Sequence, residues 1–218
     1  MERLFALIVT LTTALSYVNV KCLVLPVPAY TIESPQFKVI HLESDFEIRL
    51  YKEISWMSAL VHGTSFRNST KDGFHRLYQY LHGANLNSTQ FFMTAPVLTS
   101  VITSSTSTHG SAYIVRYYMH PKYDDKTSPP PQPAAELNLQ LDKWKSRCIA
   151  VRKFGGFAAD DNVERERDGL VSSLGKHFPG NKYNYSIAQY NSSKHPTGRV
   201  NEVWIMDVSG FTTEGCPV

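Results

Sequence analysis

The chain has 218 residues, of which 42% are hydrophobic and 12% aromatic, enough to bury the core of a single domain. Its 22 basic and 19 acidic residues leave a formal net charge of +3 at pH 7. Because no dense block of lysine and arginine occurs along the chain, the sequence lacks the charge pattern of a nucleic-acid-binding protein.

The N-terminal segment has the pattern of a secretory signal peptide. Arg3 precedes an apolar stretch over residues 4–15, which is too short to span a bilayer. Small and polar residues follow, so we expect a leader within residues 1–22, cleaved after Ser16 or after Cys22. No later apolar run reaches the length of a membrane span. We therefore expect a mature protein without a membrane span that is secreted to the extracellular space (apoplast) or delivered to the vacuole.

Sequons and cysteines agree with the secretory route. Glycans attach to exposed N-x-S/T sites in the lumen, and the chain has four such sites, at Asn68, Asn87, Asn184 and Asn191. The cysteines are Cys22, Cys148 and Cys216. If cleavage removes the first, the other two could form a disulfide in an oxidising compartment, or the last could lie in a frayed tail. The sequence leaves the connectivity open.

The first half of the chain reads as strands, one helix and more strands. Short β-rich runs form an expected antiparallel meander over 37–42, 46–51 and 56–63. Helical spacing then predicts a helix from Ser69 to Gly83, with a stripe formed by Phe74, Leu77, Tyr78 and Leu81. Strand character returns over 91–102 and 112–120, before a proline-rich linker loop over 122–133.

The second half repeats this plan. We expect strands over 137–141, 147–154, 183–190 and 200–208, and a helix over 162–177. A shift of 93 residues superposes Gly63 on Gly156 and Leu77 on Leu170, which indicates an internal duplication. Helices that alternate with antiparallel strand pairs predict an α+β domain, with two helices against one curved sheet or barrel.

The familiar catalytic patterns are absent from the sequence, including G-x-S-x-G, H-E-x-x-H and the phosphate-binding glycine loops. The eight histidines are scattered. His75 and His82 lie seven residues apart on one face of the expected helix, too far apart for a direct metal chelate. The sequence therefore favours a binding protein over an enzyme.

Several segments together resemble the SOUL/haem-binding protein family, in particular its secreted plant members. They read, in chain order, FEIRLY (46–51), GFHRLYQYLHG (73–83), MTAPV (93–97), AVRKFGGF (150–157) and NEVW (201–204). The resemblance covers a domain over about residues 29–208, followed by a C-terminal tail over 209–218. It implies a distorted antiparallel eight-stranded β-barrel of two pseudo-symmetric halves, each with one flanking helix.

The resemblance also implies a shallow tetrapyrrole cleft beside the first helix, closed by the loop before Asn201. Carried over by position, the cleft residues are Lys71, Phe74, His75, Tyr78, Lys194 and His195. Aromatic rings suit the flat face of a haem and lysines suit its propionates. At helical spacing Phe74 and Tyr78 are first of all positions of the core stripe, so core packing is favoured over ligand contact for both, and a lysine in a first helical turn is more often solvated.

One departure from the family concerns the iron. Some animal members have a histidine after the arginine of the first motif, proposed to bind iron, where this chain has Leu50. His75 or His195 is then the remaining candidate for an axial ligand. The resemblance implies a monomeric, non-enzymatic carrier or buffer that binds haem or another tetrapyrrole non-covalently. The alternatives are a small-molecule hydrolase or isomerase on the same two-fold barrel, or a protein-interaction module.

Overall fold

The computed structural model describes residues 32–63, 65–102, 111–123, 128–175, 184–206 and 208–217. The expected signal peptide and the expected start of the domain at residue 29 lie outside these residues. Within the described part of the chain, no helix is long and apolar enough to cross a membrane.

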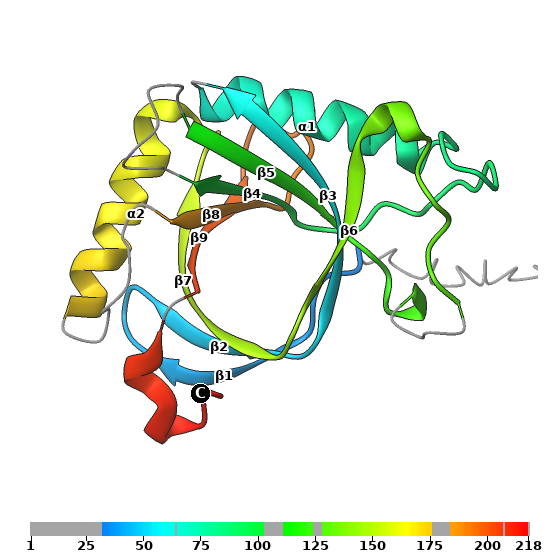
Figure 1. Ribbon diagram of the computed structural model, residues 1–218. Coiled ribbons are helices and arrows are strands. Elements are labelled where there is room, and N and C mark those ends of the chain that lie inside the picture. The colour runs from blue at the N-terminus through cyan, green and yellow to red at the C-terminus, as the bar shows by residue number, and fades with distance from the viewer. Residues whose placement is uncertain are drawn as a thin grey trace, which may run out of the picture. The chain divides into compact units, whose positions relative to one another are not determined.

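One antiparallel sheet contains all nine strands of the described residues, and two helices pack on it (Figure 1). The strands are β1 (Phe37–Leu42), β2 (Glu47–Tyr51), β3 (Ile54–Gly63), β4 (Val97–Ile102), β5 (Ser111–Tyr118), β6 (Leu139–Trp144), β7 (Arg147–Gly155), β8 (Tyr185–Gln189) and β9 (Val200–Ile205). The helices are α1 (Phe66–Leu81) and α2 (Asp160–Leu174), with 3-10 turns η1 (Pro121–Tyr123), η2 (Ala135–Leu137) and η4 (Ser209–Glu214). The sheet is strongly curled, which confirms the expected α+β class with a distorted barrel.

The order of the strands reflects the internal duplication. Neighbours in the sheet follow the order β1-β2-β7-β9-β8-β4-β5-β3-β6. The shift of 93 residues places β2 on β6, β3 on β7 and α1 on α2, and β4 and β5 correspond to β8 and β9. The run β2-β7-β9-β8 is therefore mirrored by β6-β3-β5-β4. The two halves supply the eight strands that were expected, and β1 adds a ninth along the outer edge of β2.

Side-chain alternation along the strands divides the core between the two faces of the sheet. On β3, Trp56 joins the cluster on the inner, concave face, whereas Met57 packs in an outer cluster with Leu77 of α1. On β9, Trp204 lies on the inner face, and Val203 joins the outer cluster that contains the buried side of α2. The helices thus cover the convex face, and side chains of the inner face pack against one another in a cluster of their own.

Helix α1 begins at Phe66, three residues before the expected start. The Ser65 hydroxyl accepts a hydrogen bond from the backbone N–H of Asn68 at 3.3 Å, as an N-cap residue does. The carboxylate of Asp160, the first residue of α2, accepts hydrogen bonds from the Ser65 hydroxyl at 2.9 Å and from the Phe66 N–H. A carboxylate from one half of the molecule therefore caps the helix of the other half, where the helix dipole favours negative charge.

Two segments differ from the sequence expectation. Strand β4 begins only at Val97, because Pro96 has no N–H for a ladder and Thr94 is held instead by the hydroxyl of Tyr117, at 2.8 Å from its backbone nitrogen. The expected C-terminal tail packs on the domain, since Phe211 and Cys216 are buried in the outer cluster beneath α2.

Candidate functional site

The exposed side of α1 carries a shallow groove next to the stripe that anchors the helix. Lys71, Asp72, Phe74, His75 and Tyr78 line this groove, which has a volume of about 410 Å³; we call it the α1 groove. Four of the six residues expected in the cleft therefore lie together. The groove is formed by consecutive turns of one helix, so its rings and charges are arranged by helical geometry alone.

The position of Tyr78 corrects the core interpretation of the helical stripe. The residues that anchor α1 on the sheet are Gly73, Leu77, Tyr80 and Leu81, all buried. Tyr78 is 45% exposed, because at 100° per residue it lies to the side of the line joining those positions. Its ring stacks on His82, with centroids 3.8 Å apart, and Phe74 lies half-buried beside it at 6.2 Å.

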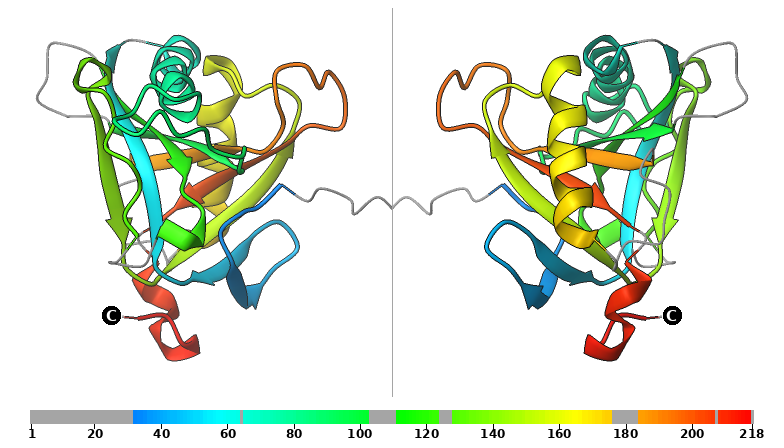
Figure 2. Two further views of the ribbon diagram at one scale, coloured as in Figure 1. Left: turned by 90° about the vertical axis from the view of Figure 1, so that its right-hand side faces the viewer. Right: turned by 90° about the vertical axis from the view of Figure 1, so that its left-hand side faces the viewer.

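Lys194 and His195 lie in the loop between β8 and β9 and are exposed. They are not among the residues that line the α1 groove. In both views of Figure 2 this loop, drawn in orange, projects beside the helices at the height of α1.

Backbone register connects this loop to the grooved side of the helix. The Thr70 hydroxyl donates to the Thr99 hydroxyl at 3.0 Å, so this side of α1 lies over β4. Val97 of β4 is the register partner of Gln189, the last residue of β8 before the loop. Val97 and Phe74 pack against the same outer cluster. The β8–β9 loop therefore begins next to the end of β4 that contains Val97, which is the end over which Phe74 packs.

Arg199 is a residue that the sequence analysis missed. Its side chain is 6% exposed, and it donates hydrogen bonds to the backbone carbonyls of Ser192 (2.6 Å), His195 (3.0 Å) and Asn191 (3.0 Å). The guanidinium also lies 4.3 Å from the centre of the Phe157 ring. Arg199 thus holds the curvature of the loop that carries Lys194 and His195. Nothing in the sequence distinguishes this arginine from a solvated one.

The candidate iron ligands differ in their surroundings. His75 is exposed, and its Nδ1 atom accepts a hydrogen bond from the Gln79 amide nitrogen at 3.3 Å. With this hydrogen bond, a neutral ring carries its proton on Nε2, which then has no free lone pair for a metal. His195 is exposed in its loop. No group of three or more metal-ligating side chains occurs among the described residues.

Leu50 lies far from the α1 groove in the strand order. It belongs to β2, where its register partner is Cys148, and it packs against the outer cluster beneath α2. Strand β2 is separated from β4 by β7, β9 and β8. A histidine at position 50 would therefore lie apart from the α1 groove. The leucine at this position does not determine whether the groove can ligate an iron.

The remaining sequence features are placed as follows. Asn68, Asn87 and Asn184 are exposed, and Asn191 is half-buried at the start of the β8–β9 loop. A disulfide joins Cys148 to Cys216, with their Cα atoms 5.5 Å apart. It connects β7 to the segment after η4 and lies in the outer cluster.

The NEVW motif forms a buried polar network on the inner face of the sheet. The Glu202 carboxylate is 3.0 Å from Nη1 of Arg49 and accepts hydrogen bonds from the Tyr190 hydroxyl (2.7 Å) and Trp204 Nε1 (2.8 Å). Burial and the neighbouring carboxylate raise the pKa of Tyr190 well above its usual range, so the phenol keeps its proton and donates. The motif is structural, because its acidic side chain is engaged by three partners within the fold.

These features define a class of protein: an α+β domain with one curled antiparallel sheet of two matching halves, and a groove on the first helix. The sequence profile of the SOUL heme-binding protein family matches residues 32–206, and the chain belongs to this family. Human heme-binding protein 2 is 28% identical over 193 residues, which cover 85% of this chain and 91% of that protein.

A second relative and one solved structure are also similar to this chain. Heme-binding protein 1 from Xenopus laevis is 29% identical over 161 residues, covering 74% of this chain and 83% of that protein. Among solved structures, the EcmrR C-terminal domain matches with a TM-score of 0.53 at 8% identity, covering 74% of this chain and 95% of that domain. The latter is a likeness of fold alone.

Proposed function

We propose that this protein binds haem or another tetrapyrrole non-covalently in the α1 groove and carries or buffers it as a monomer, without catalysing a reaction. Membership of the SOUL family supports the ligand class, since the relatives named above are heme-binding proteins. The observation that carries the site is Tyr78, a tyrosine that is 45% exposed next to the half-buried ring of Phe74. Aromatic surface of this kind suits a flat apolar ligand.

The residues of the groove fit the two parts of a haem. Phe74 and Tyr78 offer ring surface to the macrocycle, and the ammonium groups of Lys71 and Lys194 would pair with the propionates. A bound haem would supply an iron able to accept an axial ligand. His75 lines the groove and His195 belongs to the β8–β9 loop, and the hydrogen bond from Gln79 to Nδ1 of His75 opposes ligation by that ring. We therefore propose weak or exchangeable iron ligation.

The expected affinity follows from area and charge. If about 200 to 300 Å² of apolar surface is removed from water, the gross gain is on the order of 5 to 8 kcal/mol. Association costs reduce this gain and charge pairing adds to it. A dissociation constant near micromolar, equivalent to roughly 8 kcal/mol, is the expected result.

We propose that this binding takes place in the extracellular space or the vacuole. The apolar N-terminal segment, the exposed sequons and the disulfide support this proposal. The native protein should then lack residues up to 16 or 22 and carry glycans on at least two sequons. Intact mass before and after glycosidase treatment measures both, and an unchanged mass with Met1 retained would contradict the proposal.

The central experiment titrates the purified protein with haem and with iron-free protoporphyrin. Weak ligation predicts that the two bind nearly equally well. A loss of about a hundredfold or more without iron, equivalent to roughly 2.7 kcal/mol, would show a strong axial ligand and contradict that part of the proposal.

Variants locate the site. Tyr78→Asp places a charge against the macrocycle at an exposed position, so it should weaken binding without unfolding the protein. Leu86→Asp is the matched control, because Leu86 is 70% exposed and does not line the groove. Phe74→Asp should also weaken binding more than His75→Ala does, with circular dichroism as the folding check. Haem binding that is unchanged in both aspartate variants of the groove would refute the site.

Charge reversal separates the propionate contacts from the ring contacts. The double variant Lys71→Glu with Lys194→Glu should weaken haem binding but spare a porphyrin ester that has no free propionates. Equal losses for haem and ester would contradict the proposed pairing. The absorption spectrum of protein from its native source would show whether a porphyrin accompanies it.

A further inference from the structure

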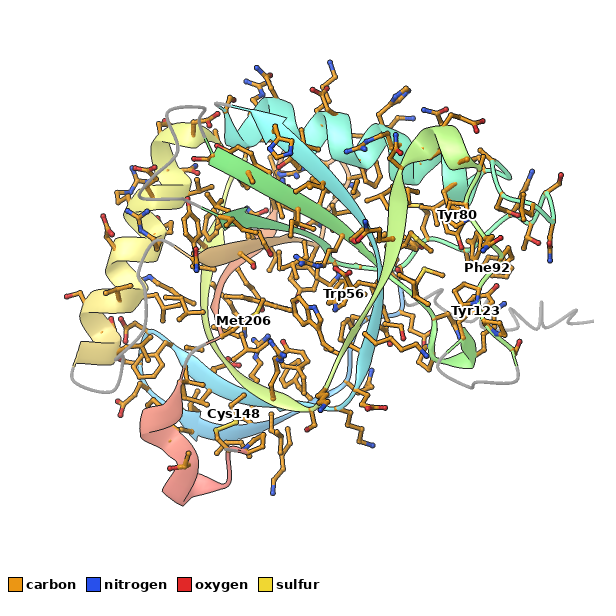
Figure 3. All side chains as sticks on the ribbon, viewed as in Figure 1. Trp56, Tyr80, Phe92, Tyr123, Cys148 and Met206 are labelled. Atoms are coloured by element: carbon orange, nitrogen blue, oxygen red, sulfur yellow. A yellow bond between two sulfur atoms is a disulfide. The ribbon has the colours of Figure 1, made fainter. Side chains whose placement is uncertain are left out.

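The inner face of the curled sheet contains a second cavity, of about 470 Å³, at the end of the sheet where β4 finishes and β8 begins. We call it the inner cavity. Its lining includes Ser100, Arg116, Trp144, Arg147, Trp204 and Met206. Figure 3 shows Met206 and the neighbouring Trp56 inside the ring of strands. The described residues at its rim, Ile102 and Asn184, are exposed to solvent.

The inner cavity and the α1 groove lie on opposite faces of the sheet. Thr99 bonds to Thr70 of α1 on the convex face. Ser100, the next residue of β4, lines the inner cavity. Because consecutive strand residues point to opposite faces, β4 itself separates the two sites. None of the described residues lines both.

The charge of the inner cavity is unbalanced. Two of its described lining residues are arginines and none is acidic. The carboxylate of Asp142 accepts a hydrogen bond from Nε of Arg116 at 3.0 Å, and Arg116 also donates to the Ser100 hydroxyl at 2.6 Å. Burial lowers the pKa of Arg116, Asp142 offsets part of this effect, and the adjacent Arg147 adds to it. One carboxylate thus faces two guanidinium groups.

Arg147 has no carboxylate partner among the described residues. Its Nη1 lies 3.6 Å from the thioether sulfur of Met206, which is a weak acceptor. Its Nε–H is buried and has no hydrogen-bond partner in the described part of the chain. Because a buried, unsatisfied donor on a charged group costs free energy, the geometry calls for an acceptor that the described residues do not supply.

Two tryptophan rings, those of Trp144 and Trp204, also line the cavity. The ring of Trp144 has the guanidinium of Arg116 at 5.1 Å and that of Arg147 at 5.4 Å from its centre. Trp56 lies 5.3 Å from Trp144 and 6.4 Å from Trp204, and its indole N–H is a second buried donor without a described partner. Flat apolar surface and free N–H donors therefore meet at one place.

We propose that the inner cavity is a binding site for a small organic anion with a flat aromatic body, such as an aromatic carboxylate or sulfonate. The anionic group pairs with Arg147 and takes the free Nε–H, and the ring system packs against Trp144 and Trp204. This site is separate from the proposed tetrapyrrole groove, and the two occupy opposite faces of the sheet.

The test uses the full chain and the probe anilinonaphthalene sulfonate. Trp144 and Trp204 line the cavity, and Trp56, the third tryptophan of the protein, is buried in contact with both of their rings, so quenching of tryptophan emission reports occupancy. We expect saturable binding of one probe per chain. The neutral analogue N-phenylnaphthylamine, which lacks the sulfonate, should bind about tenfold more weakly or worse. Equal binding of the two probes would overturn the proposal.

Three variants complete the test. Arg147→Gln should weaken the sulfonate about tenfold, whereas Lys143→Gln should not, because this exposed lysine next to Trp144 points away from the inner face. If Arg147→Gln fails to fold, Met206→Glu replaces it, since a carboxylate at this half-buried position would occupy the guanidinium and exclude the anion. If Arg147→Gln, or Met206→Glu where it replaces it, folds and still binds the sulfonate as tightly as the wild type, the proposal is overturned.

Haem titrations of the same variants distinguish this site from the α1 groove. We expect Arg147→Gln to bind haem as the wild type does and Tyr78→Asp to bind the sulfonate as the wild type does. Haem binding that is lost in Arg147→Gln but kept in Tyr78→Asp would place the tetrapyrrole in the inner cavity, and would overturn the separate anion site.

Discussion

Replacement of Glu202 by leucine should be among the most destabilising changes in this protein. The Glu202 side chain is buried, and the substitution removes the acceptor of Tyr190 and Trp204 and one partner of the buried Arg49 guanidinium. Breaking a buried ion pair costs about 3 to 5 kcal/mol. Arg49 keeps a hydrogen bond to Glu47 at 2.7 Å, which favours the lower end of that range.

The two orphaned neutral donors add to this loss. Each unsatisfied donor costs about 1 kcal/mol or more, and the neighbouring groups relax partly, so we expect Glu202→Leu to lose about 4 kcal/mol. Glu202→Gln keeps an acceptor oxygen and loses only the charge, so it should lose about half as much. Since domains have stabilities of about 5 to 15 kcal/mol, the leucine variant should be close to unfolding.

Urea denaturation followed by far-ultraviolet circular dichroism measures these differences. The control is Glu53→Leu, which changes an exposed glutamate and should stay within about 0.5 kcal/mol of the wild type. A loss below about 1 kcal/mol for Glu202→Leu, or a larger loss for the glutamine variant than for leucine, would refute the role assigned to this network.

Three other predictions concern the disulfide, the packing of α1 on the sheet and the β8–β9 loop. Reduction of the Cys148–Cys216 disulfide, which closes a segment of 68 residues, should cost about 2 to 4 kcal/mol in the same denaturation assay, and an unchanged midpoint under reductant would contradict a closed bond. Gly73→Ala should lower the melting temperature despite the better helix propensity of alanine, because the new Cβ would lie 2.4 Å from a methyl carbon of Val115; a rise would mean that α1 moves freely on the sheet. Arg199→Ala should speed amide hydrogen exchange in the β8–β9 loop and weaken haem binding with little change in global stability, and unaltered exchange would show that the loop is held by other contacts.

The sequence was sufficient for most elements, which depend on local periodicity, and for the duplication, which depends on similarity between the two halves. The spacing of apolar residues predicted both helices and most strands to within a few residues, with β4 beginning six residues later than expected, and the shift that aligns Gly63 with Gly156 matches the mirrored strand order. The family resemblance, which the profile match confirms, supplied the barrel-like topology. Local periodicity alone does not specify which strands become neighbours.

Tertiary structure decided the features that depend on residues far apart in the chain. The capping of α1 by Asp160 joins the two halves, and the sequence pattern placed the helix start three residues too late without it. Periodicity assigned Tyr78 to the core stripe, but the helix packs on the sheet through Gly73, Leu77 and Leu81, and Tyr78 lies to the side of that line and is exposed. The inner cavity is a second feature that the sequence alone does not predict. Arg116 and Arg147 come from different halves of the chain, and only the closing of the sheet brings their charges to one wall of the cavity. A sequence reports which side chains are available, whereas their desolvation and pairing, which determine what they can bind, arise only when distant strands meet.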